Sequence, residues 1–272
     1  MATLPFSCNA APLSTNAIQN AMDSLGIDSP TLWAMLHVET RGCGYFPSRR
    51  PQILFERHIF SKLTQGAWDS TAPDISNPMP GGYGASGDFQ YSRLGKAYGL
   101  DPSAQDPALK SASWGLGQVL GMNATSLGYQ SVRDMVAAMA ASEDQQLKAV
   151  VSFILSNKLQ NALQNQDWGA YAAVYNGADY AKNHYDTNLA FAHALYQDAS
   201  KLPDLTVRAG QLALLVLGFD PKGIDGALGP NTLTALHNFQ SQKNIPLTIN
   251  LDSDVLATLT AALPAPAQLS LS

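Results

Sequence analysis

Charged residues and cysteines are scarce in this sequence of 272 residues. Asp, Glu, Lys and Arg together make up 14% of it, well below the usual quarter. The formal net charge is −5, whereas a chain that binds nucleic acid or an anionic membrane through charge is basic. Neither partner is therefore expected. Hydrophobic residues make up 46%, which argues against a disordered chain and is enough for a buried core.

Cysteine usage also excludes a disulfide-built scaffold, because such domains carry more than the two cysteines present, Cys8 and Cys43. Two free thiols are the simpler interpretation, and one bridge stays open. The longest apolar run, 212–219, is interrupted by Gly218 and is too short to span a bilayer. The first residues lack the basic and apolar regions of a secretory signal peptide. We therefore expect a protein made in the cytoplasm and not inserted in a membrane.

Apolar residues recur every three to four positions along much of the chain, which predicts a mostly α fold with at most a small β-hairpin. The expected helices of a first domain, residues 1–200, lie at 15–25, 29–39, 131–140, 144–159, 167–175 and 188–199. The apolar run at 52–55 is either a strand or the entry to a helix, and 66–88 is a long surface loop rich in Gly and Pro.

Residues 201–204 have the composition of a linker, and the pattern after them changes. Three short helices are expected near 212–217, 233–239 and 255–259, which predicts a small second domain over 206–264. We expect the tail, 264–272, to be frayed.

Glu39 lies at the end of a predicted helix, before a glycine-rich turn. The negative end of the helix dipole disfavours an ionised carboxylate there, and apolar neighbours such as Val38 raise its pKa further if the site is dry. A carboxylic acid that stays protonated near neutral pH can donate a proton to the leaving oxygen of a glycosidic bond. On these grounds alone, a solvated glutamate at a helix end remains the simpler interpretation.

Glu56 directly follows the apolar run, in the segment 53–58, where a carboxylate needs either a partner or a role. Arg57 or His58 could pair with it. A zinc site made from these groups is not expected, because His37, Glu39, Glu56 and His58 lack the i, i+4 spacing of a helical zinc motif. No cofactor is expected either.

Four ordered blocks carry a resemblance to a known family. They lie at 38–44, 50–60, 113–121 and 175–180. Together they resemble the N-acetylmuramidase family of phage and prophage endolysins, over residues 30 to 197. The resemblance implies a lysozyme-like, mostly α-helical fold. It also implies hydrolysis of the β-1,4 bond between N-acetylmuramic acid and N-acetylglucosamine.

The resemblance also implies site residues. Glu39 matches the catalytic general acid, and Glu56 matches the glutamate of the family's Leu-Phe-Glu-Arg-His block, a candidate second carboxylate. Substrate-binding roles follow for Trp114, Gln118, Tyr175 and Asn176. Gln118 ends a Gly-Leu-x-Gln loop like the one that lines the sugar cleft of lysozyme relatives, and aromatic faces stack on sugars while amides match N-acetyl groups. For Trp114 and Tyr175, core packing is an equal alternative.

The second domain resembles the three-helix peptidoglycan-binding domain whose marker is Asp-Gly-x-x-Gly-Pro-x-Thr. The matching residues are Asp225, Gly226, Gly229, Pro230 and Thr232. The segment 246–252 lacks the second glycine-rich signature that such domains usually carry, which leaves the affinity of the module open. A helical bundle without a binding role is the alternative.

These observations together predict a monomeric endolysin of the lysozyme class whose partner is the glycan strand of peptidoglycan. Expected in the host cytoplasm, it would reach the periplasmic wall by a separate release route such as a holin and cause lysis of the host cell. Two alternatives remain: a lytic transglycosylase, which leaves 1,6-anhydro ends, and a non-catalytic murein-binding protein. The presence of Glu39 together with all four blocks favours the enzyme over the latter.

Overall fold

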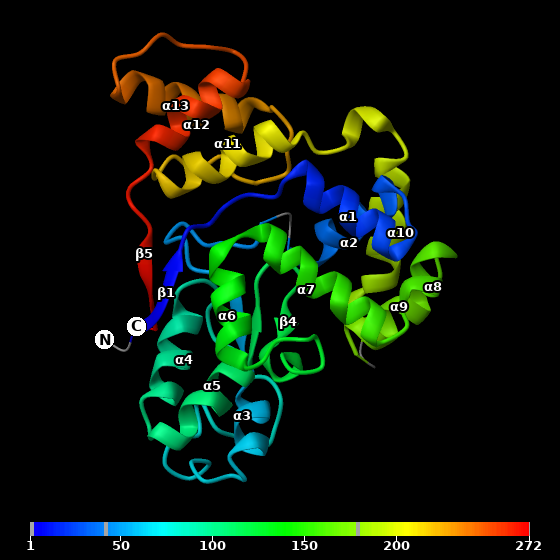
Figure 1. Ribbon diagram of the computed structural model, residues 1–272, viewed down its shortest axis with the longest axis vertical. Coiled ribbons are helices and arrows are strands. Elements are labelled where there is room, and N and C mark those ends of the chain that lie inside the picture. The colour runs from blue at the N-terminus through cyan, green and yellow to red at the C-terminus, as the bar shows by residue number, and fades with distance from the viewer. Residues whose placement is uncertain (1–2, 41–42, 178–179, 272) are drawn as a thin grey trace. The chain divides into compact units, whose positions relative to one another are not determined.

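The structure is a computed structural model (Figure 1). It describes residues 3–40, 43–177 and 180–271. These residues form mainly α-helices together with two small antiparallel sheets, so the predicted mostly α class is confirmed. Among them, no helix is both long and apolar enough to cross a membrane.

The chain divides into two compact units, each built from segments that are far apart in the sequence. The first unit comprises Met1–Ala11, Gly44–Ala149 and Pro266–Ser272, and the second comprises Pro12–Cys43 and Val150–Ala265. Each unit is therefore described by itself. The predicted domain limits at 1–200 and 206–264 stay a prediction.

A three-stranded antiparallel sheet organises the first unit. Its strands, in sheet order, are β2 (Ile53–Phe55), β3 (Ala112–Trp114) and β4 (Val119–Leu120). The run at 52–55 is thus a strand, and α3 (Arg57–Leu63) begins just after it. Glu56 consequently lies at the junction between sheet and helix.

The first unit also contains further helices. They are α4 (Phe89–Tyr98), α5 (Gln105–Lys110), α6 (Val132–Ala141) and the first half of α7 (Glu143–Ser156), with 3-10 turns at Pro102–Ala104 and Gly121–Asn123. Of these helices, α4 and α5 contact this sheet. Residues 64–88 contain neither helix nor strand, as predicted for the long loop.

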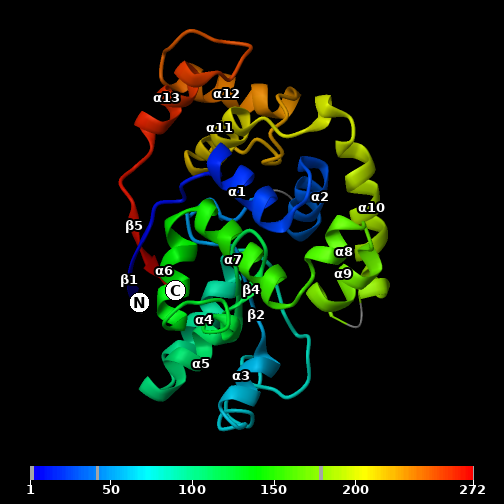
Figure 2. The same ribbon diagram turned by 45° about the vertical axis from the view of Figure 1, so that its right-hand side comes forward.

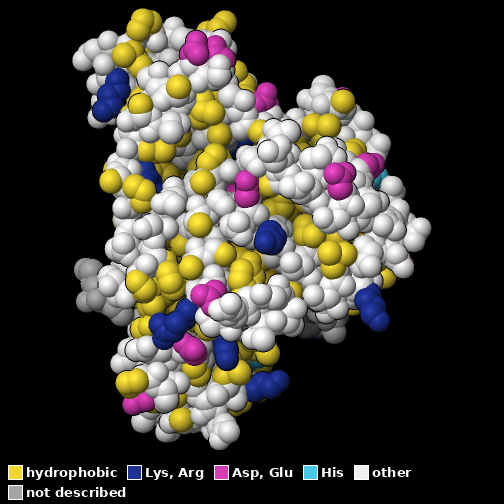
Figure 3. All heavy atoms as spheres, in the orientation of Figure 1, with side chains coloured by type: hydrophobic (Ala, Val, Ile, Leu, Met, Phe, Trp, Pro, Cys, Tyr) yellow, Lys and Arg dark blue, Asp and Glu magenta, His cyan; other side chains and the backbone are white. Residues whose placement is uncertain are grey.

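On the face drawn in Figure 3, charged side chains of the described residues are few and of both signs.

Local capping sets the helix ends in the second unit. Helix α1 (Thr15–Leu25) has the predicted limits, because the Ser14 hydroxyl accepts a hydrogen bond from the Ala17 N–H and Gly26 adopts a left-handed φ of 63°. The next helices are α2 (Ser29–Thr40), α8 (Gln160–Gln164), α9 (Trp168–Tyr175) and α10 (Tyr185–Tyr196). Helix α10 starts three residues before the predicted 188, directly after the 3-10 turn Tyr180–Asn183.

After a further 3-10 turn at Ala199–Lys201, the three predicted short helices are present. They are α11 (Leu205–Val216), α12 (Pro230–Gln242) and α13 (Ser253–Ala262). They share a core whose most buried members are Leu214, Leu236, Phe239 and Leu259. A bundle with its own apolar core is what the sequence pattern predicts.

The expectation of a frayed tail is wrong. Strand β5 (Ala267–Ser270) pairs antiparallel with β1 (Thr3–Cys8), and the two strands lie side by side in both views (Figure 1, Figure 2). Leu269 and Leu271 have exposed fractions of 0%. A tail docked through buried leucines and a strand partner is not free to fray. Its partner lies at the opposite end of the sequence, so no local pattern announces the pairing.

Helix α4 carries a glycine in its interior to accommodate this tail. A Cβ atom at Gly95 would lie 1.8 Å from the carbonyl oxygen of Leu271. Glycine in a helix interior is destabilising by about 1 kcal/mol relative to alanine. The close approach of the tail is the physical reason for a residue that the helix itself disfavours.

We predict that Gly95→Ala lowers the free energy of unfolding by about 1–3 kcal/mol, the opposite of its usual effect, because the tail must move aside. Thermal and urea unfolding measure it. The control is Gly169→Ala in α9, where the nearest atom to an added Cβ is the Tyr180 hydroxyl at 3.6 Å, an ordinary contact. A Gly95→Ala protein that is as stable as the control protein would contradict the docked tail.

Candidate active site

Glu39 lies in the last turn of α2. The preceding turns of this helix are buried, and they set the position of the glutamate. Leu32, Ala34 and Met35 have exposed fractions of 0%. The helix packs against α10, and the Nδ1 atom of His37 lies 2.9 Å from the Tyr196 hydroxyl. The glutamate itself is half-buried. The predicted position at a helix end is confirmed, and the interpretation as a fully solvated helix-end glutamate is wrong.

Desolvation dominates the electrostatics of Glu39. Burial raises the pKa of its carboxyl to about 7, and the hydrogen bond from Asn176 offsets this only in part. The Nδ2 atom of Asn176 donates to Oε1 of Glu39 at 2.9 Å. Asn176 is the C-cap residue of α9, and its side-chain Oδ1 is buried without a hydrogen-bond partner in the described structure. A carboxyl near its pKa at neutral pH can both give and take a proton.

The charge of Glu39 affects the pKa values of three tyrosines in the second unit. Burial is the main cause of the raised pKa values of Tyr171, Tyr175 and Tyr185, and the charge of Glu39 contributes to all three. The rings of Tyr171 and Tyr175 stack with centroids 5.1 Å apart, and Phe153 meets Tyr175 edge-on at 5.1 Å. Half-buried Tyr175 therefore packs on aromatic side chains and also lies near enough to Glu39 for that charge to raise its pKa. Sequence reasoning missed Tyr171, although its i, i+4 spacing from Tyr175 was available as a signal.

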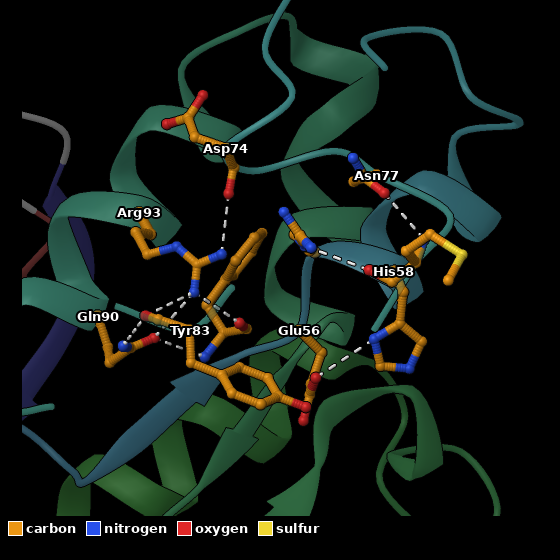
Figure 4. Close-up of polar contacts among 10 residues, drawn as sticks. Glu56, His58, Asp74, Asn77, Tyr83, Gln90 and Arg93 are labelled. Carbon is orange, nitrogen blue, oxygen red and sulfur yellow. Dashed lines mark hydrogen bonds and ion pairs between the residues drawn. The ribbon is translucent and has the colours of Figure 1, made fainter. Parts of the chain in front are cut away.

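Glu56 occupies a separate cluster in the first unit (Figure 4). Its Oε2 atom lies 3.3 Å from Nδ1 of His58, so one of the two predicted pairings is present. Arg57 instead donates from Nε to the Met79 carbonyl oxygen at 3.2 Å. Burial raises the pKa of Glu56, while His58, a hydrogen bond from Tyr83 and then the charge of Arg93 lower it. Sequence reasoning missed Tyr83.

The Gly-Leu-x-Gln loop also lies in the first unit. Gln118 has a left-handed φ of 47°, and its Nε2 donates to the carbonyl oxygens of Gly115 at 2.9 Å and Gln52 at 3.3 Å. Both amide protons are thus used on backbone, and the amide oxygen is the group suited to accept a bond from a ligand. Trp114 is a core residue with an exposed fraction of 0%, and its indole donates to the Leu109 carbonyl oxygen. For Trp114, the packing alternative describes the structure.

Two buried polar side chains of α7 hold this loop and the turn at Gly44. The Oε1 atom of Gln146 accepts from the Leu116 N–H at 2.7 Å, and its Nε2 donates to the Met139 carbonyl oxygen at 2.8 Å. The Oε1 atom of Glu143 accepts from the Gly44 N–H at 2.9 Å. Nothing in the local sequence pattern singles out these two residues. Cys8 and Cys43 are both buried and no disulfide joins them, in line with the simpler of the two interpretations.

Gln211 of α11 holds the Asp-Gly-x-x-Gly-Pro-x-Thr loop. Its Oε1 accepts from the Gly226 N–H at 2.8 Å. Its Nε2 donates to Asp225 Oδ1 at 2.8 Å, to the Ala227 carbonyl oxygen at 3.1 Å and to Thr232 Oγ1 at 3.0 Å. Gln211 is almost fully buried, with an exposed fraction of 1%. Several residues of the signature therefore stabilise the conformation of the loop through hydrogen bonds to a buried side chain.

The glycine and proline positions of this signature have geometric causes. Gly226 has a φ of 73°, and a Cβ there would lie 2.7 Å from Cβ of Pro203. Gly229 is the N-cap residue of α12, and Pro230 occupies its first turn. Whether the signature residues also contact the cell wall stays a prediction.

Comparison with known proteins agrees with this geometry. The model of a family described as N-acetylmuramidase matches residues 28–197, more than half of the chain. The chain belongs to the N-acetylmuramidase family. A model described as a putative peptidoglycan binding domain matches residues 204–259 of this muramidase. No curated protein matches it.

Among solved structures, the muramidase is similar to one titled the crystal structure of Burkholderia AP3 phage endolysin. The two sequences are 37% identical over 69% of this chain and 72% of that one, with a TM-score of 0.62. The protein is therefore a glycoside hydrolase of the endolysin type that acts on peptidoglycan, with a lysozyme-like catalytic domain and a helical peptidoglycan-binding domain. The predicted family, fold and partner are confirmed.

We predict that Gln211→Leu lowers the free energy of unfolding of the bundle by about 2–4 kcal/mol, because it leaves the Gly226 N–H and its neighbours buried without partners. Urea unfolding and sedimentation with purified peptidoglycan measure stability and binding together. Gln242→Leu, at an exposed position of the same bundle, is the matched control and should change stability by less than about 0.5 kcal/mol. Equal stability of both variants would contradict the proposed role of Gln211.

The raised pKa of Glu39 predicts a pH-dependent gain in stability for Glu39→Gln. The Glu39 carboxyl has its ordinary pKa of 4.5 in the unfolded chain and a pKa of about 7 in the folded one, so the wild-type protein loses stability as the pH rises through this window. Since glutamine does not titrate, the variant should be more stable by on the order of 2–3 kcal/mol at pH 8, but by much less at pH 5. Unfolding experiments at both pH values test this, and an equal difference at the two would show that the carboxyl is not desolvated.

Proposed function

We propose that this muramidase is a lysozyme that hydrolyses the β-1,4 bond between N-acetylmuramic acid and N-acetylglucosamine, with Glu39 as the general acid. The observation that carries the proposal is the half-buried Glu39 carboxyl, whose pKa burial raises to about 7. Such a group is protonated in a useful fraction of molecules at neutral pH. It can therefore donate a proton to the glycosidic oxygen as the bond to the sugar breaks.

In this proposal, Asn176 keeps the acid oriented through the whole cycle. An amide N–H can donate to the carbonyl oxygen of the neutral acid and also to the carboxylate that remains after proton transfer. The 2.9 Å bond from Asn176 to Glu39 therefore suits both protonation states. A lysine or arginine partner would favour the carboxylate and remove the proton that the reaction needs.

The second half of the reaction requires a water molecule that attacks the anomeric carbon. We assign Glu56 as the carboxylate that takes the proton from this water. His58, Tyr83 and Arg93 all favour the ionised form of Glu56 against the effect of burial, which is the state a base needs. We further propose that Gln118 accepts a hydrogen bond from a substrate N-acetyl group, and that Tyr175 lines the sugar site.

We propose that the bundle keeps the enzyme on its insoluble substrate and so raises the effective concentration of bonds to be cleaved. Lysis of a host cell would follow once a separate release route, such as a holin, gives a cytoplasmic pool of enzyme access to the periplasmic wall. A monomer suffices for this scheme.

The test measures the rate at which Glu39→Gln hydrolyses purified peptidoglycan. The control for the loss of one carboxylate is Asp23→Asn, at an exposed position of α1. Glu39→Gln should lower the rate by roughly 10²- to 10⁴-fold, and the control should leave it unchanged. Wild-type activity should fall as the pH rises above about 7, because the general acid ionises there. Mass spectrometry should find reducing ends on the fragments. Undiminished activity of Glu39→Gln would refute the acid, and 1,6-anhydro ends would identify a transglycosylase.

A further inference from the structure

The Glu56 backbone is held by the elements on both sides of it, while its side chain does not cap the helix that follows. Its N–H donates to the Ser111 carbonyl oxygen at 2.8 Å, and its carbonyl oxygen accepts from the Phe60 N–H at 3.1 Å. Glu56 is the N-cap residue of α3, yet its side chain makes no capping hydrogen bond. The carboxylate instead lies beside the Tyr83 hydroxyl and the His58 ring (Figure 4).

Tyr83 is presented by a loop of specific shape. It lies between Gly82 and Gly84, whose φ angles of 66° and 67° are both left-handed. A Cβ at Gly82 would lie 2.6 Å from the Arg57 guanidinium carbon, and one at Gly84 would lie 2.5 Å from the Phe89 ring. The left-handed backbone favours glycine at both positions, and the Phe89 ring also leaves no room for a side chain at position 84. Together the two glycines fix the position of Tyr83.

Helix α4 ties the tyrosine to the strand that precedes Glu56. The Nη1 atom of Arg93 donates to the carbonyl oxygens of Tyr83 at 3.0 Å and Phe55 at 3.1 Å, and its Nη2 donates to that of Asp74 at 2.9 Å. The Nε2 atom of Gln90 adds a bond to the Tyr83 carbonyl oxygen at 2.8 Å. Both side chains are buried. One guanidinium thus joins the residue before Glu56 to the residue whose phenol faces it.

Among the described residues, three titratable or charged side chains face the Glu56 carboxylate: His58 from α3, Tyr83 from the loop and Arg93 from α4. Of these, Tyr83 makes the side-chain hydrogen bond. The Oε2 atom of Glu56 is buried, and its 3.3 Å contact with Nδ1 of His58 is not a hydrogen bond, so it has no hydrogen-bond partner in the described part of the chain. A desolvated carboxylate with an unsatisfied oxygen is costly for stability alone, which indicates a chemical role.

We propose that Tyr83 is a positioning residue for this reaction: its hydroxyl donates to the Glu56 carboxylate and holds it in the orientation that takes a proton from the attacking water. The inference rests on the proposed role of Glu56 and adds a residue that lies outside the four sequence blocks. Tyr83 needs no contact with the substrate. Its effect passes through Glu56 alone.

Tyr83→Phe on soluble glycan fragments is the direct test, because it removes one oxygen and keeps the ring. We expect kcat to fall about tenfold with little change in KM. We also expect the acidic limb of the pH profile to move to higher pH, since loss of a bond to the ionised form raises the pKa of Glu56. A purely structural role would not move that limb. Tyr98→Phe is the matched control, because its hydroxyl also bonds a charged side chain, that of Arg133, at 3.0 Å.

The double variant separates this inference from the proposed function. If Tyr83 acts through Glu56, Tyr83→Phe should cause no further loss when added to Glu56→Gln. An active Glu56→Gln protein would overturn the role of Glu56 and this inference with it, and would leave Glu39 as the acid. A strongly impaired Glu56→Gln protein together with an unmoved pH limb in Tyr83→Phe would overturn the inference about Tyr83 alone.

Discussion

Burial of the Glu39 carboxyl at the end of α2 is the constraint on which the proposed chemistry depends. The preceding turns of this helix lie in the core, and the last turn therefore carries the glutamate out of bulk water. As a result, the ionised form of the carboxyl is destabilised in the folded protein, and its pKa is raised to about 7. Its hydrogen-bonding neighbour, Asn176, is an uncharged amide that does not force ionisation. Desolvation and a neutral partner together keep the group available as an acid.

The two carboxyls of the proposed mechanism differ in which groups oppose the effect of burial on their pKa values. For Glu39, a single amide hydrogen bond lowers the pKa. For Glu56, a histidine, a phenol and a guanidinium act in that direction. Burial raises the pKa of both carboxyls, but more groups oppose that rise at Glu56 than at Glu39. Here the difference arises from the elements around each glutamate, since the residue type is the same.

The irregular segments of this protein owe their definite shapes to buried polar side chains. Arg93 binds three backbone carbonyl groups around the long loop, Gln146 accepts from the Leu116 N–H of the Gly-Leu-x-Gln loop, and Gln211 organises the signature loop of the bundle. Buried backbone polar groups must be paired, and a loop cannot pair them with itself as a helix does. One multivalent side chain per loop meets that requirement.

Local sequence determined the helix ends set by capping, such as those of α1, as well as the bundle signature and the position of Glu39 at a helix end. These depend on residues within a few positions of one another. Only the tertiary structure decided that the tail pairs with β1, that Trp114 is core, and that Asn176 and Tyr83 face the two glutamates. Each of these depends on groups brought together by packing, and neither periodicity nor spacing along the chain encodes which distant residues will meet.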